Sequence, residues 1–149
     1  MRLALILLPL CASFLSTSTF AQTKPEDAIK YRRSVYTVLL WNWMPMNAMV
    51  RGRIAFDAKE FSRRAERVAA LAPQLLEGFP EGSDTGATTD AKPDIWKNFD
   101  DFSAKMKDLE TESAALAVIA KGGDEAAIKE QFAKTGGACK ACHDNYKAD

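Results

Sequence analysis

The sequence Cys139-Lys140-Ala141-Cys142-His143 contains two of the three cysteines and the single histidine of this 149-residue chain. Thiols three residues apart share one face of a helix, and the histidine follows directly. In c-type haem sites, two such thiols add to the vinyl groups of the porphyrin and the imidazole ligates the iron. The motif therefore predicts one covalent haem c, attached through Cys139 and Cys142, with His143 as an axial ligand of the iron.

Three other uses of this motif have less support. A structural zinc site usually needs four Cys or His ligands, and the chain after residue 21 offers only three. A thioredoxin-like redox pair follows a strand, whereas a predicted helix precedes Cys139. A disulfide between Cys139 and Cys142 requires strain and leaves His143 without a role.

The first residues resemble an export signal. A positive charge at Arg2 precedes the apolar run from Leu3 to Leu15, which is shorter than the about 20 residues that span a bilayer. Small residues favour cleavage after Ala21. A lipid anchor at Cys11 is the alternative, but Leu10 is not the small residue expected before a lipidated cysteine. We expect a signal peptide over residues 1–21 and a periplasmic mature protein.

The composition fits one globular domain over residues 22–149. Charged residues make up 27% of the chain, hydrophobic residues make up 47%, and 20 Lys and Arg balance 20 Asp and Glu. Nucleic acid is not an expected partner, because no run is dense in basic residues. No later run is apolar enough to span a bilayer, so no membrane association is expected after signal cleavage.

The pattern beyond the motif is helical. Four segments of roughly 20 residues alternate with turn signals, and only residues 79–92 form a long loop. The predicted helices extend from a capping box at Thr23 to about Val50, from Asp57 to Gly78 with a bend at Pro73, from Pro93 to Gly122, and from Asp124 through a pause at Gly136 and Gly137 into the motif. The sequence therefore predicts an all-α, antiparallel up-down-up-down four-helix bundle.

Together with the signal peptide and the predicted bundle, the sequence from Cys139 to Tyr146 resembles the cytochromes c prime, the class II c-type cytochromes. The resemblance extends from Lys24–Ala28 and Lys30–Arg32, through Lys92–Trp96, to the haem motif. Cytochrome c prime is itself a known four-helix bundle. Class I cytochromes instead place this motif near the N-terminus and take a methionine ligand from far downstream.

The resemblance implies a five-coordinate, high-spin iron that exchanges electrons with small redox proteins and binds NO or CO. The alternative is a six-coordinate, low-spin electron carrier whose sixth ligand is Met44, Met46 or Met49. Packing in the core is the ordinary role for these methionines. We do not expect an enzyme, because the chain has no second histidine for acid–base work on a peroxide, although a weak peroxidase side activity stays open.

Two residues of the first predicted helix match family positions at the haem. Tyr36 corresponds to the residue above the iron, where its ring excludes water and large ligands and its hydroxyl can donate to a bound gas; a core tyrosine is the alternative. Arg32, four residues earlier, shares the same helix face. The resemblance implies that its guanidinium pairs with a haem propionate, and guanidinium and carboxylate geometries match.

Three further charged residues match the family at the edge of the haem. Arg33 and Asp90 correspond to lining positions, although solvated surface charges explain them equally well. Lys147 corresponds to a basic residue beside the imidazole of His143, where its charge disfavours protonation and tunes the iron potential. An ordinary cation at a helix C-terminus is the alternative.

Family members pair through their first two helices, so we expect a homodimer. The candidate contact residues are aromatic, although such residues pack in a core more often than they form a contact: Tyr31, Trp41, Trp43, Phe56 and Phe61. Because Trp41 and Trp43 are two positions apart on one helix, they cannot both face the haem.

Overall fold

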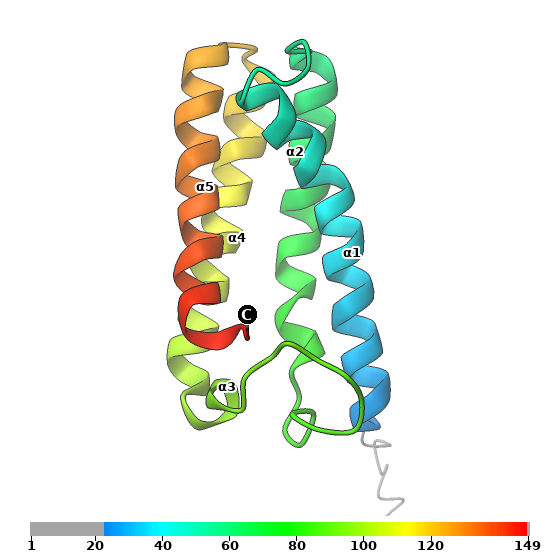
Figure 1. The fold of residues 1–149 in the computed structure, drawn as a ribbon. Helices are drawn as coiled ribbons and strands as arrows, with labels where there is room; N and C mark the ends of the chain where they lie inside the picture. Colours follow the sequence, from blue (N-terminus) through cyan, green and yellow to red (C-terminus); the bar gives the residue numbers. More distant parts are fainter. Residues whose placement is uncertain (1–22, 149) are drawn as a thin grey trace, which may run out of the picture.

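The structure is a computed structural model that describes residues 23–148. The predicted signal peptide and its cleavage site lie outside these residues. The elements are α1 (Pro25–Val50), α2 (Ala58–Leu71), η1 (Ala72–Gln74), η2 (Leu76–Gly78), α3 (Asp94–Lys97), α4 (Phe99–Lys121) and α5 (Glu125–Tyr146). The four long helices run up, down, up and down side by side, which confirms the predicted bundle (Figure 1).

Local signals explain where two of the long helices begin. The Asp57 carboxylate accepts a hydrogen bond from the backbone N–H of Glu60 at 3.0 Å and caps α2. Asp124 caps α5 in the same way, accepting from two N–H groups of its first turn. The predicted capping box at Thr23 is wrong, because Lys24 is the N-cap residue of α1 and makes no side-chain cap.

The structure differs from the prediction at a proline in one helix and at two glycines in another. The second predicted helix is α-helical only to Leu71 and continues to Gly78 as two 3₁₀ turns, since Pro73 has no N–H to donate. The predicted pause at Gly136 and Gly137 is wrong, because α5 passes through both glycines without a break. Close packing of α5 on α4 explains this, since tertiary contacts supply most of the stability of a helix in a protein.

The third predicted helix is divided at its start. Asn98 has φ −128° and ψ 47°, which separates the short α3 from α4. Within residues 23–148, none of the helices combines the length and the apolar character needed to cross a membrane.

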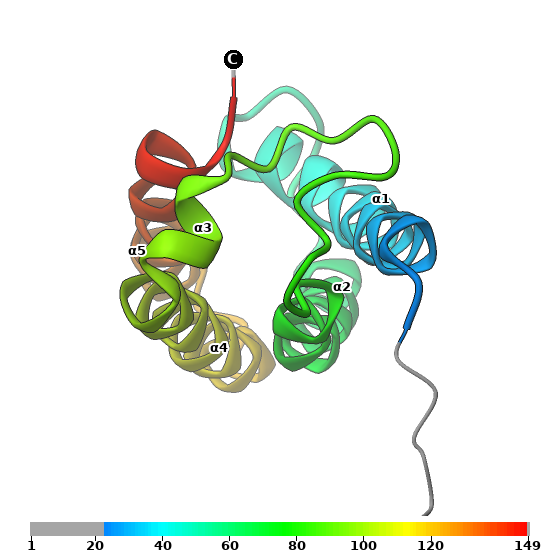
Figure 2. The same ribbon diagram turned by 90° about the horizontal axis from the view of Figure 1, so that it is seen from below.

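The bundle is open on one side. The closest packing joins α4 to α5, α2 to α4 and α1 to α2, whereas α1 and α5 have few contacts with each other. Figure 2 shows the segment after η2 crossing the end of the bundle where α5 finishes. Two backbone hydrogen bonds attach this segment to the end of α5, from Lys92 N to Tyr146 O (2.9 Å) and from Ala148 N to Asp90 O (2.7 Å).

One aromatic pair closes part of the gap between α1 and α5. The rings of Trp43 on α1 and Phe132 on α5 stack with centroids 4.0 Å apart. Phe61 of α2 meets Phe132 edge-on at 5.8 Å, which extends this cluster into the buried core.

Candidate functional site

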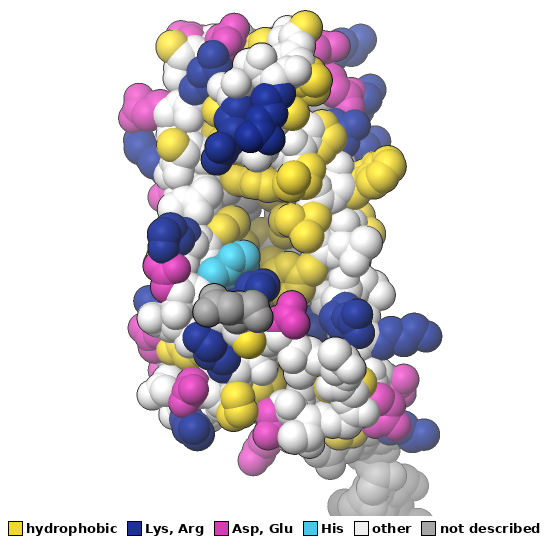
Figure 3. Space-filling view, in the orientation of Figure 1, with side chains coloured by type: hydrophobic (Ala, Val, Ile, Leu, Met, Phe, Trp, Pro, Cys, Tyr) yellow, Lys and Arg dark blue, Asp and Glu magenta, His cyan; other side chains and the backbone are white. Residues whose placement is uncertain are grey.

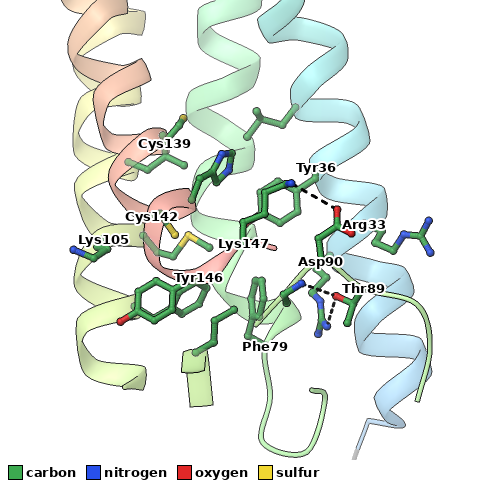
Figure 4. A pocket seen from close by; sticks show the side chains of 18 of the residues that line it. Arg33, Tyr36, Phe79, Thr89, Asp90, Lys105, Cys139, Cys142, Tyr146 and Lys147 are labelled. Carbon is green, nitrogen blue, oxygen red and sulfur yellow. Dashed lines mark hydrogen bonds and ion pairs between the residues drawn. The ribbon is translucent and has the colours of Figure 1, made fainter. Parts of the chain in front are cut away.

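A cavity of about 360 Å³ lies between α1, α4 and α5, beside the segment that follows η2 (Figure 4). The space-filling view shows a hollow with apolar walls on this side, with the one histidine at its rim (Figure 3). All eight predicted site residues line the cavity: Arg32, Arg33, Tyr36, Asp90, Cys139, Cys142, His143 and Lys147. The fold therefore assembles residues from α1, the long loop and α5 around one space.

The α5 wall carries the motif. Cys139 and Cys142 are free thiols, and burial raises the pKa of Cys142 to about 11. The pKa of His143 is lowered, first by desolvation and then by the charge of Lys147, with Asp144 opposing. The imidazole is therefore neutral at neutral pH, and a neutral imidazole offers a nitrogen lone pair to a metal.

Tyr36 lies on the α1 wall, across the cavity from the motif (Figure 4). Burial raises the pKa of its hydroxyl far above the usual value, and the two motif thiols add to this effect. Within residues 23–148, no side-chain hydrogen bond contributes to this shift. The phenol is therefore protonated and available to a group inside the cavity.

Arg32 is a buried cation, with 2% of its surface exposed. Its Nη1 donates to Gly78 O (3.1 Å), Ser83 O (2.9 Å) and Ser83 Oγ (3.1 Å), and its Nη2 donates to Thr89 Oγ1 (3.0 Å). All four acceptors are neutral, and desolvation lowers the pKa of the guanidinium. Arg32 thus attaches the segment after α2 to α1 while one edge of its side chain lines the cavity.

Aromatic rings complete the surroundings of this guanidinium. Its Cζ lies 4.8 Å from the ring centre of Phe79 and 5.6 Å from that of Trp96. Trp96 in turn donates its indole N–H to Pro80 O at 2.9 Å. Cation–π contacts of this kind stabilise a positive charge where water is scarce.

The remaining predicted charges lie at the cavity mouth. The exposed Arg33 donates one hydrogen bond, to Thr88 O at 3.3 Å. Lys147 Nζ lies 3.9 Å from Asp90 Oδ2, so two residues predicted separately form an ion pair (Figure 4). The backbone bridge between the neighbouring Ala91 and Lys147 brings them together.

The sequence did not identify the rest of the lining. Several of these residues were recognisable as the apolar face of the third predicted helix, but not as the wall of a cavity. The lining residues that the sequence missed are Thr37, Leu39, Leu40, Trp43, Phe79, Thr89, Ala91, Ile95, Phe102, Lys105, Met106, Leu109 and Tyr146.

Core packing, the ordinary role expected for the methionines of α1, is confirmed for Met46 and Met49. Met44 is exposed, Met46 and Met49 are buried in the core, and none of these three lines the cavity. Met106 on α4 lines it instead and is 2% exposed. The three proposed sources of a sixth ligand are therefore a wrong assignment, because the end of α1 lies beyond the cavity.

The predicted contact aromatics divide into two groups. Tyr31 and Trp41 are exposed, Trp41 at 74%. Phe61 is fully buried, and Trp43 and Phe56 pack against the core, so for these three the alternative of core packing is confirmed and the contact role is wrong. Trp43 lines the cavity while Trp41 is exposed to solvent, as their spacing predicts.

Comparison with known proteins gives consistent matches. Residues 27–147 match the family described as Cytochrome C′. Cytochrome c′ of Halomonas halodenitrificans is 40% identical over 131 residues, which cover 85% of this chain and 99% of the relative. The solved structure of cytochrome c prime from Shewanella frigidimarina is 47% identical with a TM-score of 0.81, covering 85% of this chain and 98% of that one.

A further similar structure was solved with a bound ligand. It is a nitric oxide complex of a variant of cytochrome c prime from Alcaligenes xylosoxidans, with 31% identity and a TM-score of 0.78. The match covers 86% of this chain and 98% of that chain.

Proposed function

The chain belongs to the cytochrome c′ family, and from this premise we propose a periplasmic haem c protein with five-coordinate, high-spin iron that transfers electrons and binds small diatomic gases. Proteins of this family carry a covalently attached haem c. The observation that supports the proposal best is the cavity, which has two thiols and an imidazole on the α5 wall and a protonated phenol on the α1 wall.

The residues present fit the cofactor. Apolar side chains from three helices exclude water from a flat ring, and the thiols of Cys139 and Cys142 are both free for thioether bonds. The neutral imidazole of His143 would hold the iron through a ring nitrogen. When bound, the haem supplies an iron that changes its oxidation state and takes up a small ligand.

The α1 side of the cavity supports an open sixth position. A phenol whose pKa is raised stays protonated at neutral pH, and a protonated phenol is a poor ligand for iron. The ring of Tyr36 restricts the space to small molecules, and its hydroxyl can donate a hydrogen bond to a bound gas. The nitric oxide complex of the Alcaligenes relative supports NO as one such gas.

Charged residues orient the propionates in this proposal. Arg32 is buried without a carboxylate partner in residues 23–148, so a propionate is the anion that neutralises it best. Arg33 and the Lys147–Asp90 pair lie at the mouth, beside the edge where electrons pass to a small redox protein. Desolvation first, and then the charge of Lys147, lower the pKa of His143 and disfavour its protonated form.

We also propose that the protein is a homodimer. Val38, Trp41 and Met44 are exposed apolar residues on α1, and a second copy of the chain covers them in the proposed dimer. Their positions agree with pairing through the first two helices, which the family resemblance implies.

Optical and EPR spectra of the mature holoprotein test the coordination. We expect high-spin signals in the ferric and ferrous states and uptake of CO by the ferrous form. A low-spin spectrum that CO does not change would overturn the open site. In that case Met106→Leu tests the remaining methionine at the cavity, with Met46→Leu as a buried control away from it.

A further inference from the structure

The three tyrosines of the chain differ in two properties, contact with the cavity and a proton acceptor for the hydroxyl. Tyr31 donates to Glu77 Oε2 at 2.9 Å but does not line the cavity. Tyr36 lines the cavity, but no hydrogen bond from its hydroxyl lies within residues 23–148. Only Tyr146 combines both properties, because it lines the cavity and donates to Asp101 Oδ2 at 2.5 Å.

Tyr146 connects the interior of the cavity with the surface. Its ring is 5% exposed and meets the ring of Phe102 edge-on at 5.3 Å. It follows His143 by three residues on α5, so the two side chains share a helix face. The acceptor Asp101 belongs to α4, is exposed, and lies 3.5 Å from Lys105 Nζ. The phenol O–H thus extends from the cavity wall to a carboxylate in contact with water.

This arrangement suits the one-electron oxidation of a phenol. Loss of an electron makes the phenol proton strongly acidic, and a buried positive charge without compensation is costly. A carboxylate that already accepts the hydrogen bond can take the proton without any rearrangement. Among the residues that the structure describes, Tyr36 has no such acceptor, and Tyr31 does not line the cavity.

We propose that Tyr146 donates an electron to the haem after a hydroperoxide has oxidised it, and that Asp101 accepts the proton that Tyr146 loses. This inference rests on the proposed haem protein. Hydrogen peroxide takes two electrons and two protons and becomes two waters as its O–O bond breaks. Tyr146 would supply one of these electrons and the haem the other, which a one-electron reductant such as ascorbate returns to the haem. Both protons come from water, which also receives the Tyr146 proton from Asp101, and the second water is complete only after that reduction.

The proton balance follows the hydrogen bond. The O–H bond of Tyr146 breaks, its proton passes to Asp101 Oδ2, and a neutral tyrosyl radical remains. Asp101 exchanges this proton with water because its side chain is exposed. A one-electron reductant such as ascorbate, together with one proton, restores the phenol. The oxidising equivalent is thereby removed from the cavity before it damages the porphyrin.

Freeze-quench EPR of the ferric holoprotein after addition of hydrogen peroxide tests the proposal. We expect a tyrosyl signal, identified by its narrowing when the tyrosines carry ring deuterium. Tyr146→Phe removes this signal. Tyr31→Phe is the matched control, because it also removes a hydroxyl bound to a carboxylate, and it keeps the signal. Tyr36→Phe keeps the signal too.

Asp101→Asn gives a second test that leaves the Tyr146 ring in place. We expect a several-fold smaller yield of radical and faster bleaching of the Soret band by peroxide. The proposal is overturned if Tyr146→Phe keeps the tyrosyl signal, if Tyr36→Phe loses it, or if the parent reacts with peroxide without forming a tyrosyl radical. In each of these three cases the haem spectra stay intact, so the proposed function stands while this inference fails. A chain purified without covalent haem would instead overturn the proposed function.

Discussion

Gly78 packs against Arg32 so closely that a Cβ atom added to Gly78 would lie 2.4 Å from Cβ of Arg32. The backbone carbonyl of Gly78 also accepts a hydrogen bond from Arg32 Nη1 at 3.1 Å. The end of the second 3₁₀ turn can therefore touch α1 only where a residue has no side chain. This contact positions the following loop across the end of the cavity and buries the guanidinium beneath it.

Gly78→Ala should destabilise the protein by about 1–3 kcal/mol, the usual cost of adding a methyl group to a closely packed contact. Urea unfolding of the holoprotein measures this. Gly137→Ala is the control with the opposite sign, because a Cβ there meets nothing within 4 Å and the residue is inside α5. Gly137→Ala should stabilise the protein by about 0.5–1 kcal/mol, because alanine has a higher helix propensity than glycine. Equal effects of both changes would contradict this account.

Arg32→Met should cost about 3 kcal/mol or more, because it leaves several buried acceptors without donors. The lost bonds attach the segment around Ser83 and Thr89 to α1, so limited proteolysis should cut this segment faster. Arg33→Met is the matched control. It removes a single hydrogen bond at the surface and should change stability by less than about 0.5 kcal/mol. Slow, parent-like proteolysis of Arg32→Met would refute the anchoring role.

Tyr36→Ala should raise the affinity for CO and its binding rate, since the ring limits the space on the α1 side of the cavity. A gain of about tenfold corresponds to about 1.4 kcal/mol of relieved steric cost. Flash photolysis and equilibrium titration of the ferrous protein measure both quantities. Tyr31→Ala removes an exposed tyrosine of the same helix and should leave both unchanged. Parent-like CO binding in Tyr36→Ala would show that another part of α1 covers the iron.

Lys147→Ala should lower the reduction potential of the haem, because a positive charge near His143 favours the ferrous state. The shift should be on the order of tens of millivolts for one partly screened charge. Redox titration measures it. Lys140→Ala is the control, since its ammonium is paired with Asp144 at 2.6 Å and it does not line the cavity. A larger shift for Lys140→Ala than for Lys147→Ala would contradict the assignment.

Tyr146→Phe should change how stability depends on alkaline pH. The hydrogen bond to Asp101 is the first cause that raises the pKa of Tyr146, from 10.0 to about 12. Below pH 10.0 the hydroxyl is protonated in both the folded and unfolded states, so its contribution is fully present. Between 10.0 and about 12 the unfolded state loses its proton first, and the contribution disappears. The variant should therefore lose less stability over this range than the parent does.

Urea midpoints of both proteins across the alkaline range check this result. Asp101→Asn is the matched variant, since it removes the same carboxylate and should also flatten the curve. A parent-like slope in Tyr146→Phe would show that the hydrogen bond does not persist in solution.

Local chemistry explains why several elements were predictable. The caps at Asp57 and Asp124 act within one turn, so short windows of sequence contain their causes. The pause at Gly136 and Gly137 was predicted from the same local rules and was wrong. There the weak helix preference of two glycines is overcome by the packing of α5 against α4, which no short window contains.

The sequence by itself determined the helical bundle, the family and the haem motif, because the spacing of Cys139, Cys142 and His143 is defined within a single helix. Only the tertiary structure decided which side chains meet across the cavity. The contact of Gly78 with Arg32, the Tyr146–Asp101 hydrogen bond and the place of Met106 on the cavity wall all join distant segments. The register between these segments is set by side chains packing between helices, and helical periodicity specifies the face of each residue but not its partner on the neighbouring helix.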